Sequence, residues 1–119
     1  MDLPAKQITI ALLVAGTNEP SNSDALANVF AEGCREIEGV IVEKIRIKDL
    51  HIADFTLDFY KPDHAMEDDF SKIETLIERA SGVLIASPVW NFSVPAHLKN
   101  VIDRMGAFAL DEQGRSKGQ

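Results

Sequence analysis

Residues 8–14 read Ile-Thr-Ile-Ala-Leu-Leu-Val, and residues 16–23, which follow almost at once, read Gly-Thr-Asn-Glu-Pro-Ser-Asn-Ser. The first stretch is almost continuously apolar and begins with β-branched side chains, which is typical of a strand covered on both faces. The second stretch gathers turn formers and helix N-cap residues, so it ends the strand and can start a helix. Together they predict a strand, a polar loop and a helix in succession.

The predicted helix begins at Asp24, because apolar residues then recur at helical spacing. We expect the following side chains to face the core: Leu26, Val29, Phe30 and Ile37. Residues 44–48, Lys-Ile-Arg-Ile-Lys, then alternate charge with isoleucine, which indicates a strand over residues 40–48 with one wet face or at an edge. Residues 49–67 show no clean period, and a connection of this length usually forms a functional lid or binding loop.

The strand-to-helix alternation continues to the end of the chain. A second amphipathic helix is expected from Phe70, where Ser71-x-x-Glu74 matches the capping-box pattern. Residues 82–86, Gly-Val-Leu-Ile-Ala, predict a fully apolar strand, and a third helix is expected from about Pro95. Its apolar face is predicted to consist of Leu98, Val101, Ile102 and Met105.

This βαβαβα order predicts an α/β fold with a doubly wound parallel sheet, helices on both faces and right-handed crossovers. We expect one domain over residues 1–119. Three strands are fewer than the five or six usual for such a sheet. If residues 8–14 lie between the other strands, residues 82–86 form an exposed edge. The tail at 111–119 is typical of a loop leading to a fourth strand, so we expect a domain truncated after its third βα unit or completed by a partner segment.

Composition narrows the class of protein. The formal net charge of −7 argues against nucleic-acid binding, which needs a basic face. The single cysteine, Cys34, excludes disulfides within the chain and multi-cysteine metal sites. No signal peptide or membrane-spanning run is present, so a soluble cytoplasmic protein is expected.

Other charged and titratable groups have ordinary interpretations. The three histidines show no metal-ligand spacing and are expected at the surface: His51, His64 and His97. The acidic run 67–69 indicates a charge bias at a helix N-terminus. Lys99, Asp103 and Arg104 indicate a solvated helix face or a dimer contact, and no metal site is predicted.

The loop at 16–23 is the first candidate site. A turn between a parallel strand and a helix presents backbone N–H groups and the positive helix end to an anion. With one glycine and no GK[ST] ending, the loop matches neither a dinucleotide fingerprint nor a nucleotide P-loop, and it suits a compact monophosphate such as that of FMN. A helix capped by Ser21 or Ser23 without any ligand is the equally weighted alternative.

The loop at 87–95, Ser-Pro-Val-Trp-Asn-Phe-Ser-Val-Pro, is the second candidate. Two prolines stiffen it, and it displays two large aromatic side chains and several amides. A flavin ring needs aromatic or apolar packing on its faces and backbone hydrogen bonds along its polar edge. Both loops follow neighbouring strands at their carboxyl ends, where open α/β sheets bind ligands. Taken alone, the aromatic residues favour ordinary core packing.

Here the chain resembles the NAD(P)H-dependent FMN reductases of the flavodoxin-like fold family. The resemblance rests on residues 87–91, on the loop at 16–23, and on residues 95–104, Pro-Ala-His-Leu-Lys-Asn-Val-Ile-Asp-Arg. It covers essentially the whole chain and implies a flavodoxin-like sheet, bound FMN and a homodimer or homotetramer. The chain departs from many relatives in having Glu19 in place of an arginine, and it ends before the fourth strand whose loop completes their flavin site.

By position, the resemblance assigns one set of residues to the FMN phosphate and another to its ribityl chain and ring. The phosphate set is Thr17, Asn18, Ser21, Asn22 and Ser23. The second set is Pro88, Val89, Trp90, Asn91 and Phe92.

The implied reaction passes hydride from NAD(P)H through the flavin to a small acceptor such as a quinone or free flavin. It requires no catalytic side chain, because the cofactor supplies the chemistry. The alternatives are a flavodoxin-like FMN electron carrier, with which the acidity agrees, and a truncated chain without flavin activity.

Overall fold

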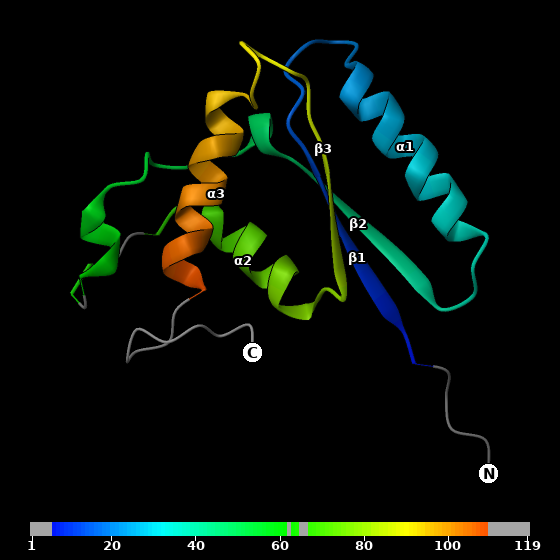
Figure 1. The fold of residues 1–119 in the computed structure, drawn as a ribbon. Coiled ribbons are helices and arrows are strands. Elements are labelled where there is room, and N and C mark those ends of the chain that lie inside the picture. The colour runs from blue at the N-terminus through cyan, green and yellow to red at the C-terminus, as the bar shows by residue number, and fades with distance from the viewer. Residues whose placement is uncertain (1–5, 62, 65–66, 110–119) are drawn as a thin grey trace.

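A parallel sheet organises the part of the chain that the structure, a computed structural model, describes: residues 6–61, 63–64 and 67–109. Its strands are β1 (Ile8–Val14), β2 (Val40–Arg46) and β3 (Gly82–Ala86), in the order β2-β1-β3 (Figure 1). The first residue of β1, Ile8, pairs with Val40, and its last, Val14, pairs with both Arg46 and Ala86. β1 therefore lies between the other two strands, and β2 lies at one edge of the described sheet, the second of its two sequence interpretations.

Helices cover both faces of this sheet, as expected (Figure 1). Successive β1 residues point to opposite faces. Leu12 and Val14 pack in the core under α1 (Asn22–Arg35). Leu13 and Ala15 lie in a second core with α2 (Phe70–Arg79) and α3 (Ala96–Phe108). The carboxyl end of β1 is thus held from both sides, which places the loop that follows it.

Of the predicted core face of α1, only Phe30 is confirmed, because it is partly buried and packs against the core under this helix. Leu26 and Val29 are 71% and 67% exposed, whereas the buried residues of this helix are Ser23, Ala27 and Ala31. These small side chains recur every four residues, so they form one stripe along which the helix backbone approaches the sheet closely. Ile37 is also exposed and follows the helix, which ends at Arg35.

The connection from β2 to α2 is ordered by short turns and aromatic contacts. β2 ends at Arg46, earlier than predicted, and 3₁₀ turns occupy Ile47–Asp49 and Leu57–Tyr60. Phe55 stacks on Phe59 at 5.9 Å between ring centroids and meets Tyr60 edge-on. Both phenylalanines are partly buried, while Tyr60 is exposed.

The start of α2 differs from the capping-box prediction. Ser71 lies inside the helix, and its hydroxyl donates to the Asp68 carbonyl at 3.2 Å. The amide of Phe70 instead donates to the Asp68 carboxylate at 3.0 Å. The expected bias of negative charge toward this helix end is present, and Asp68 has a further role described below.

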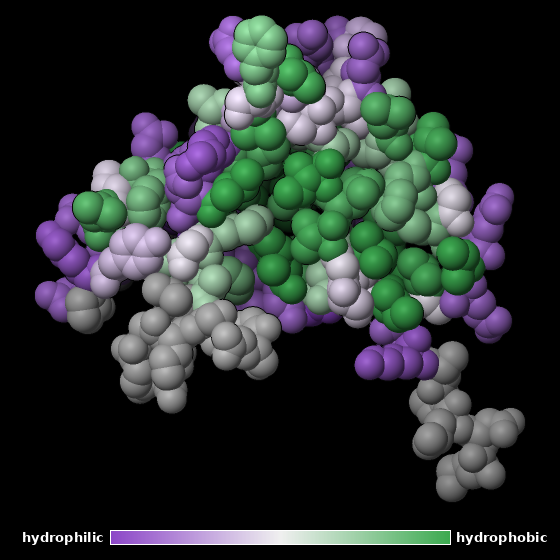
Figure 2. All heavy atoms as spheres, in the orientation of Figure 1, coloured by the Kyte–Doolittle hydropathy of each residue, from purple (hydrophilic) through white to green (hydrophobic). Residues whose placement is uncertain are grey.

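β3 lies at an edge of the described sheet, where it leaves an apolar surface. Val83 and Ile85 of this strand are exposed, as are Leu26 and Val29 of α1. Figure 2 shows hydrophobic side chains gathered broadly over these two elements. We call these four residues the β3–α1 surface. Apolar surfaces of this kind mark contacts with further chain or with partners. The predicted tail at 111–119 lies outside the described residues.

Candidate flavin site

The two candidate loops meet at one edge of the sheet. One leaves the carboxyl end of β1 and the other that of β3, and these parallel strands are direct neighbours. The amide of Ala15 donates to the carbonyl of Ala86 at 2.8 Å, which extends the pairing to the bases of both loops. The strand register therefore holds the bases of the two loops side by side.

A capped turn shapes the loop after β1. Ser21 is the N-cap of α1, and its Oγ accepts a hydrogen bond from the Asp24 amide at 3.2 Å. This leaves the hydroxyl hydrogen of Ser21 to be donated to another group. Gly16 lies so close that an added Cβ would stand 2.2 Å from Ser21 Oγ and 3.2 Å from Ser23 Cβ. The tight fold of the loop thus requires glycine at position 16.

A cavity of about 130 Å³ opens between the two loops. It brings together most of the residues predicted to bind the cofactor. They are Thr17, Asn18, Ser21, Asn22, Ser23, Pro88 and Trp90, with Gly16 beside them. Val89, Asn91 and Phe92 do not line it. The cavity combines three hydroxyl groups, the N-terminus of α1 and an indole ring, which suits an anion attached to an aromatic group.

Basic residues of β2 and the turn after it hold the acidic groups of this loop. The Glu19 carboxylate forms ion pairs with Lys48 and, at 3.6 Å, with Arg46. Asp24 binds Lys44 at 2.9 Å and Arg46 at 2.6 Å. Hydrogen bonds from Lys44 and then Arg46 lower the pKa of Asp24. Glu19 does not line the cavity, and its charge is offset by cations, so its presence is compatible with an anion there.

The loop after β3 carries an unusual turn. Trp90 and Ser93 exchange backbone hydrogen bonds of 2.9 and 3.0 Å, with Asn91 and Phe92 between them at φ of 50° and 67°. Two-residue turns with positive φ at both positions normally carry Asn-Gly, because a side chain in the left-handed region costs about 1–2 kcal/mol. The Phe92 ring is 103% exposed, so no contact among the described residues offsets that cost. Such strain clusters at ligand-binding loops.

This geometry predicts that Phe92→Gly will have a free energy of unfolding about 1 kcal/mol higher than Phe92→Ala, because both lose the ring and only glycine relieves the backbone. Thermal unfolding measures the difference, which corresponds to roughly 4 °C. Equal melting temperatures of the two variants would show that the turn is unstrained.

Three residues predicted at the surface are instead buried or half-buried. His64 is half-buried and lies edge-on to Phe59. His97, half-buried at the start of α3, lies 2.8 Å from the Ala15 carbonyl and edge-on to Trp90.

Arg104 is 5% exposed, so its assignment to a solvated face or dimer contact is wrong. It binds Asp68 at 2.8 Å. No local sequence pattern indicates that Arg104 is buried, because its partner lies 36 residues earlier in the chain.

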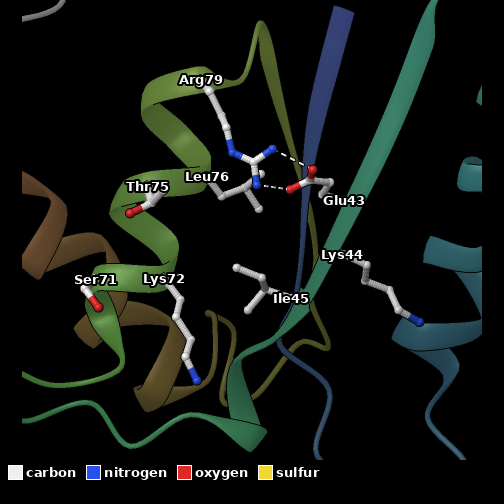
Figure 3. Close-up of a pocket in the computed structure, with 8 residues that line it drawn as sticks. All are labelled: Glu43, Lys44, Ile45, Ser71, Lys72, Thr75, Leu76 and Arg79. Atoms are coloured by element: carbon white, nitrogen blue, oxygen red, sulfur yellow. Dashed lines mark hydrogen bonds and ion pairs between the residues drawn. The ribbon is translucent and has the colours of Figure 1, made fainter.

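A larger cavity, of about 400 Å³, lies between β2 and α2, away from both loops (Figure 3). Ile45 and Leu76 form its apolar part, and Arg79 makes two hydrogen bonds with Glu43 across it (Figure 3). The bond from Arg79 lowers the pKa of Glu43. The charges of Arg79 and Glu43 in this cavity are therefore satisfied within the protein. Charged side chains at a sheet edge also discourage pairing with other strands. We do not assign a ligand to it.

The comparison with protein families identifies the family of this chain. Residues 8–117 match the model of the NADPH-dependent FMN reductases. The chain belongs to this family. No curated protein sequence matches it.

Two solved structures share the fold of this chain. An azoreductase from Bacillus anthracis str. Sterne superimposes with a TM-score of 0.67 and 17% identity, over 83% of this chain and 55% of the azoreductase. An oxidoreductase from Corynebacterium diphtheriae gives a TM-score of 0.65 and 21% identity, over 87% of this chain and 59% of that protein. The expected flavodoxin-like α/β fold is confirmed, and the chain spans little more than half the length of either protein.

Two further properties concern the part of the chain that the structure describes. None of its helices is long and apolar enough to cross a membrane. Within the same residues, no three His, Cys, Asp or Glu side chains are arranged to hold a metal ion.

Proposed function

We propose that this FMN reductase family member binds FMN and acts as an NAD(P)H oxidoreductase that passes hydride through the flavin to a small acceptor such as a quinone or a flavin. The carrying observation is the cavity that joins the hydroxyl-rich loop at the N-terminus of α1 to Trp90 on the neighbouring loop. Family membership over residues 8–117 supports the same function.

The residues around the cavity fit the phosphate end of FMN. At about 130 Å³ the cavity is smaller than the roughly 300–1,000 Å³ of whole-ligand pockets, so it accommodates a phosphate rather than a complete flavin. Thr17, Ser21 and Ser23 would donate hydroxyl hydrogens to it, and Asn18 and Asn22 would complete the loop around it. The positive end of α1 would add to the attraction.

The loop after β3 would hold the ribityl chain and ring. Pro88 and Trp90 border the cavity, while Val89, Asn91 and Phe92 extend away from it and would contact the part of FMN outside. When bound, FMN supplies the hydride and electron transfer chemistry. The protein would position the cofactor and exclude water, and no side chain is assigned a proton-transfer role.

Assembly and location are also part of the proposal. The exposed β3–α1 surface supports a homodimer or homotetramer or a contact with further chain, because an apolar face at the edge of the described sheet favours association. We infer a cytoplasmic protein whose partners are small-molecule electron acceptors.

The first test compares FMN with riboflavin, which lacks the phosphate. Two charge-assisted hydrogen bonds of about 1.5 kcal/mol each should make FMN bind about 100-fold more tightly. Quenching of the only tryptophan, Trp90, and of flavin fluorescence reports both affinities. Equal affinities would contradict the phosphate loop, and no binding of either flavin would contradict the cofactor assignment.

Stopped-flow mixing of the FMN-loaded protein with NADPH and NADH then separates the enzyme from an electron carrier. Rapid loss of flavin absorbance is expected for the reductase. A flavin that stays oxidised with both nucleotides would favour the flavodoxin-like carrier, with which the net charge of −7 agrees.

A further inference from the structure

His97 connects three parts of the candidate site. It is the second residue of α3 and is half-buried. Its Nε2 lies 2.8 Å from the carbonyl oxygen of Ala15. Because a carbonyl can only accept, this nitrogen must carry the hydrogen and donate it. The imidazole is therefore oriented by a defined hydrogen bond to the backbone.

The acceptor of this bond lies at the base of the phosphate loop. Ala15 is fully buried and immediately precedes Gly16, the first residue of the loop. Its amide is already paired with Ala86 of β3. A buried carbonyl without a donor costs about 1–3 kcal/mol, so the bond from His97 stabilises the backbone direction in which the chain leaves β1.

The same imidazole also contacts the second loop. Its ring centroid is 5.9 Å from that of Trp90, at an interplanar angle of 67°. This edge-on arrangement is one that aromatic pairs prefer. Trp90 in turn lines the cavity together with the residues of the phosphate loop. One side chain on α3 thus touches the base of the first loop and the aromatic wall of the second.

We propose that His97 is a positioning residue that sets the separation between the phosphate loop and Trp90, and so prepares the cavity for a phosphate-bearing flavin. This inference rests on the proposed function for its ligand. The two contacts of His97 can be tested separately, because the hydrogen bond acts on the loop after β1 and the ring contact acts on Trp90.

Two substitutions separate these contacts. His97→Gln keeps an N–H donor for Ala15 and loses the ring, whereas His97→Phe keeps a ring beside Trp90 and loses the donor. We expect His97→Phe to weaken FMN binding about tenfold, the equivalent of one lost hydrogen bond, with riboflavin affinity reduced less. His97→Gln should restore most of the preference for FMN over riboflavin, while acrylamide quenches Trp90 fluorescence more readily than in the wild type.

His51→Ala is the matched control, because this histidine is exposed and outside the cavity. This variant should leave unchanged both the preference for FMN over riboflavin and the acrylamide quenching of Trp90. Wild-type flavin preference and Trp90 quenching in both His97 variants would overturn the proposal.

The quenching of Trp90 is measured without flavin, so it tests the positioning role separately from the cofactor. If the wild type binds no FMN and His97→Gln still exposes Trp90, the proposed function fails and the positioning role stands. If the wild type binds FMN and neither variant differs from it, the positioning role fails and the proposed function stands. Circular dichroism of each variant identifies any loss of folding, and each of the two variants tests its own contact independently.

Discussion

Replacing Arg104 by methionine is expected to lower the free energy of unfolding by about 3 kcal/mol, because it leaves the Asp68 carboxylate, whose side chain is only 13% exposed, without its cation. Arg104 is 5% exposed and binds both Asp68 oxygens, at 2.8 and 3.2 Å. Asp68→Asn should have a similar effect, since it leaves the guanidinium buried and uncompensated. Urea unfolding followed by circular dichroism measures both losses.

The contacts around Arg104 explain the size of this effect. Its guanidinium lies 4.1 Å from the Phe59 ring centroid and 4.6 Å from that of Phe70, on two different segments. It also donates to the Ala53 carbonyl at 2.9 Å. Asn100, one helical turn earlier, accepts from the Phe55 amide at 2.7 Å. This helix face therefore holds the long connection between β2 and α2 in place.

Lys99→Met provides a matched control on the same helix. Lys99 pairs with Asp103 at 2.5 Å, and its side chain is 61% exposed. Its loss should cost at most about 1 kcal/mol, as for other surface pairs. The double variant Arg104→Met/Asp68→Asn should be more stable than Arg104→Met alone, because asparagine keeps an oxygen that can accept from a backbone amide and no unpaired charge remains. Similar losses for Lys99→Met and Arg104→Met would contradict the buried-pair argument.

The ion pair also predicts a pH dependence. Burial opposes the charge of Asp68, but the hydrogen bonds from Arg104, Ala53 and Phe70 outweigh burial and lower its pKa below the ordinary 3.8. The folded state therefore favours the ionised form, and the resulting stability is fully present above pH 3.8. It is lost as pH falls below that value through the lowered pKa. Asp68→Asn should remove this part of the acid dependence in urea unfolding.

Strand and loop placement could be predicted because it depends on local patterns and one general rule. The apolar runs at 8–14 and 82–86 are both strands with the predicted bounds. Loops after adjacent parallel strands must meet at one edge, so the meeting of the two candidate loops followed directly. The helix α1 was different, because hydrophobicity favours Leu26 over Ala27 as a core residue. The close approach of this helix to the sheet reverses that order.

The roles of His97 and Arg104 could not be predicted, because both depend on partners far apart in the sequence. An arginine on an amphipathic helix is usually exposed, and only the fold places Asp68, Phe59 and Phe70 around this one. The positive φ of Phe92 is likewise invisible in the sequence, where glycine would have been the expected residue. Packing between elements, rather than local preference, decides the positions of His97 and Arg104 and the backbone conformation of Phe92.

Gly16→Ala is expected to weaken FMN binding by about 100-fold or more. The added Cβ would stand 2.2 Å from Ser21 Oγ and 3.3 Å from Ser21 Cβ, so Ser21 must move. That movement breaks its hydrogen bond with the Asp24 amide, at a cost of about 1 kcal/mol in stability. The same Cβ would stand 3.2 Å from Ser23 Cβ, so the hydroxyls of both Ser21 and Ser23 are displaced from the cavity. Losing these two charge-assisted bonds to a phosphate costs about 3 kcal/mol, or 100-fold in affinity.

Gly33→Ala is the matched control, because its new Cβ would meet nothing within 4 Å and it lies within α1, far along the helix from the loop. Alanine in a helix should raise the free energy of unfolding by up to about 1 kcal/mol and leave FMN affinity unchanged. Riboflavin separates steric damage from loss of phosphate contacts, since Gly16→Ala should reduce its binding far less than that of FMN. An unchanged FMN affinity in Gly16→Ala would show that the phosphate does not occupy this loop, whereas equal losses for both flavins would place the damage at the ring.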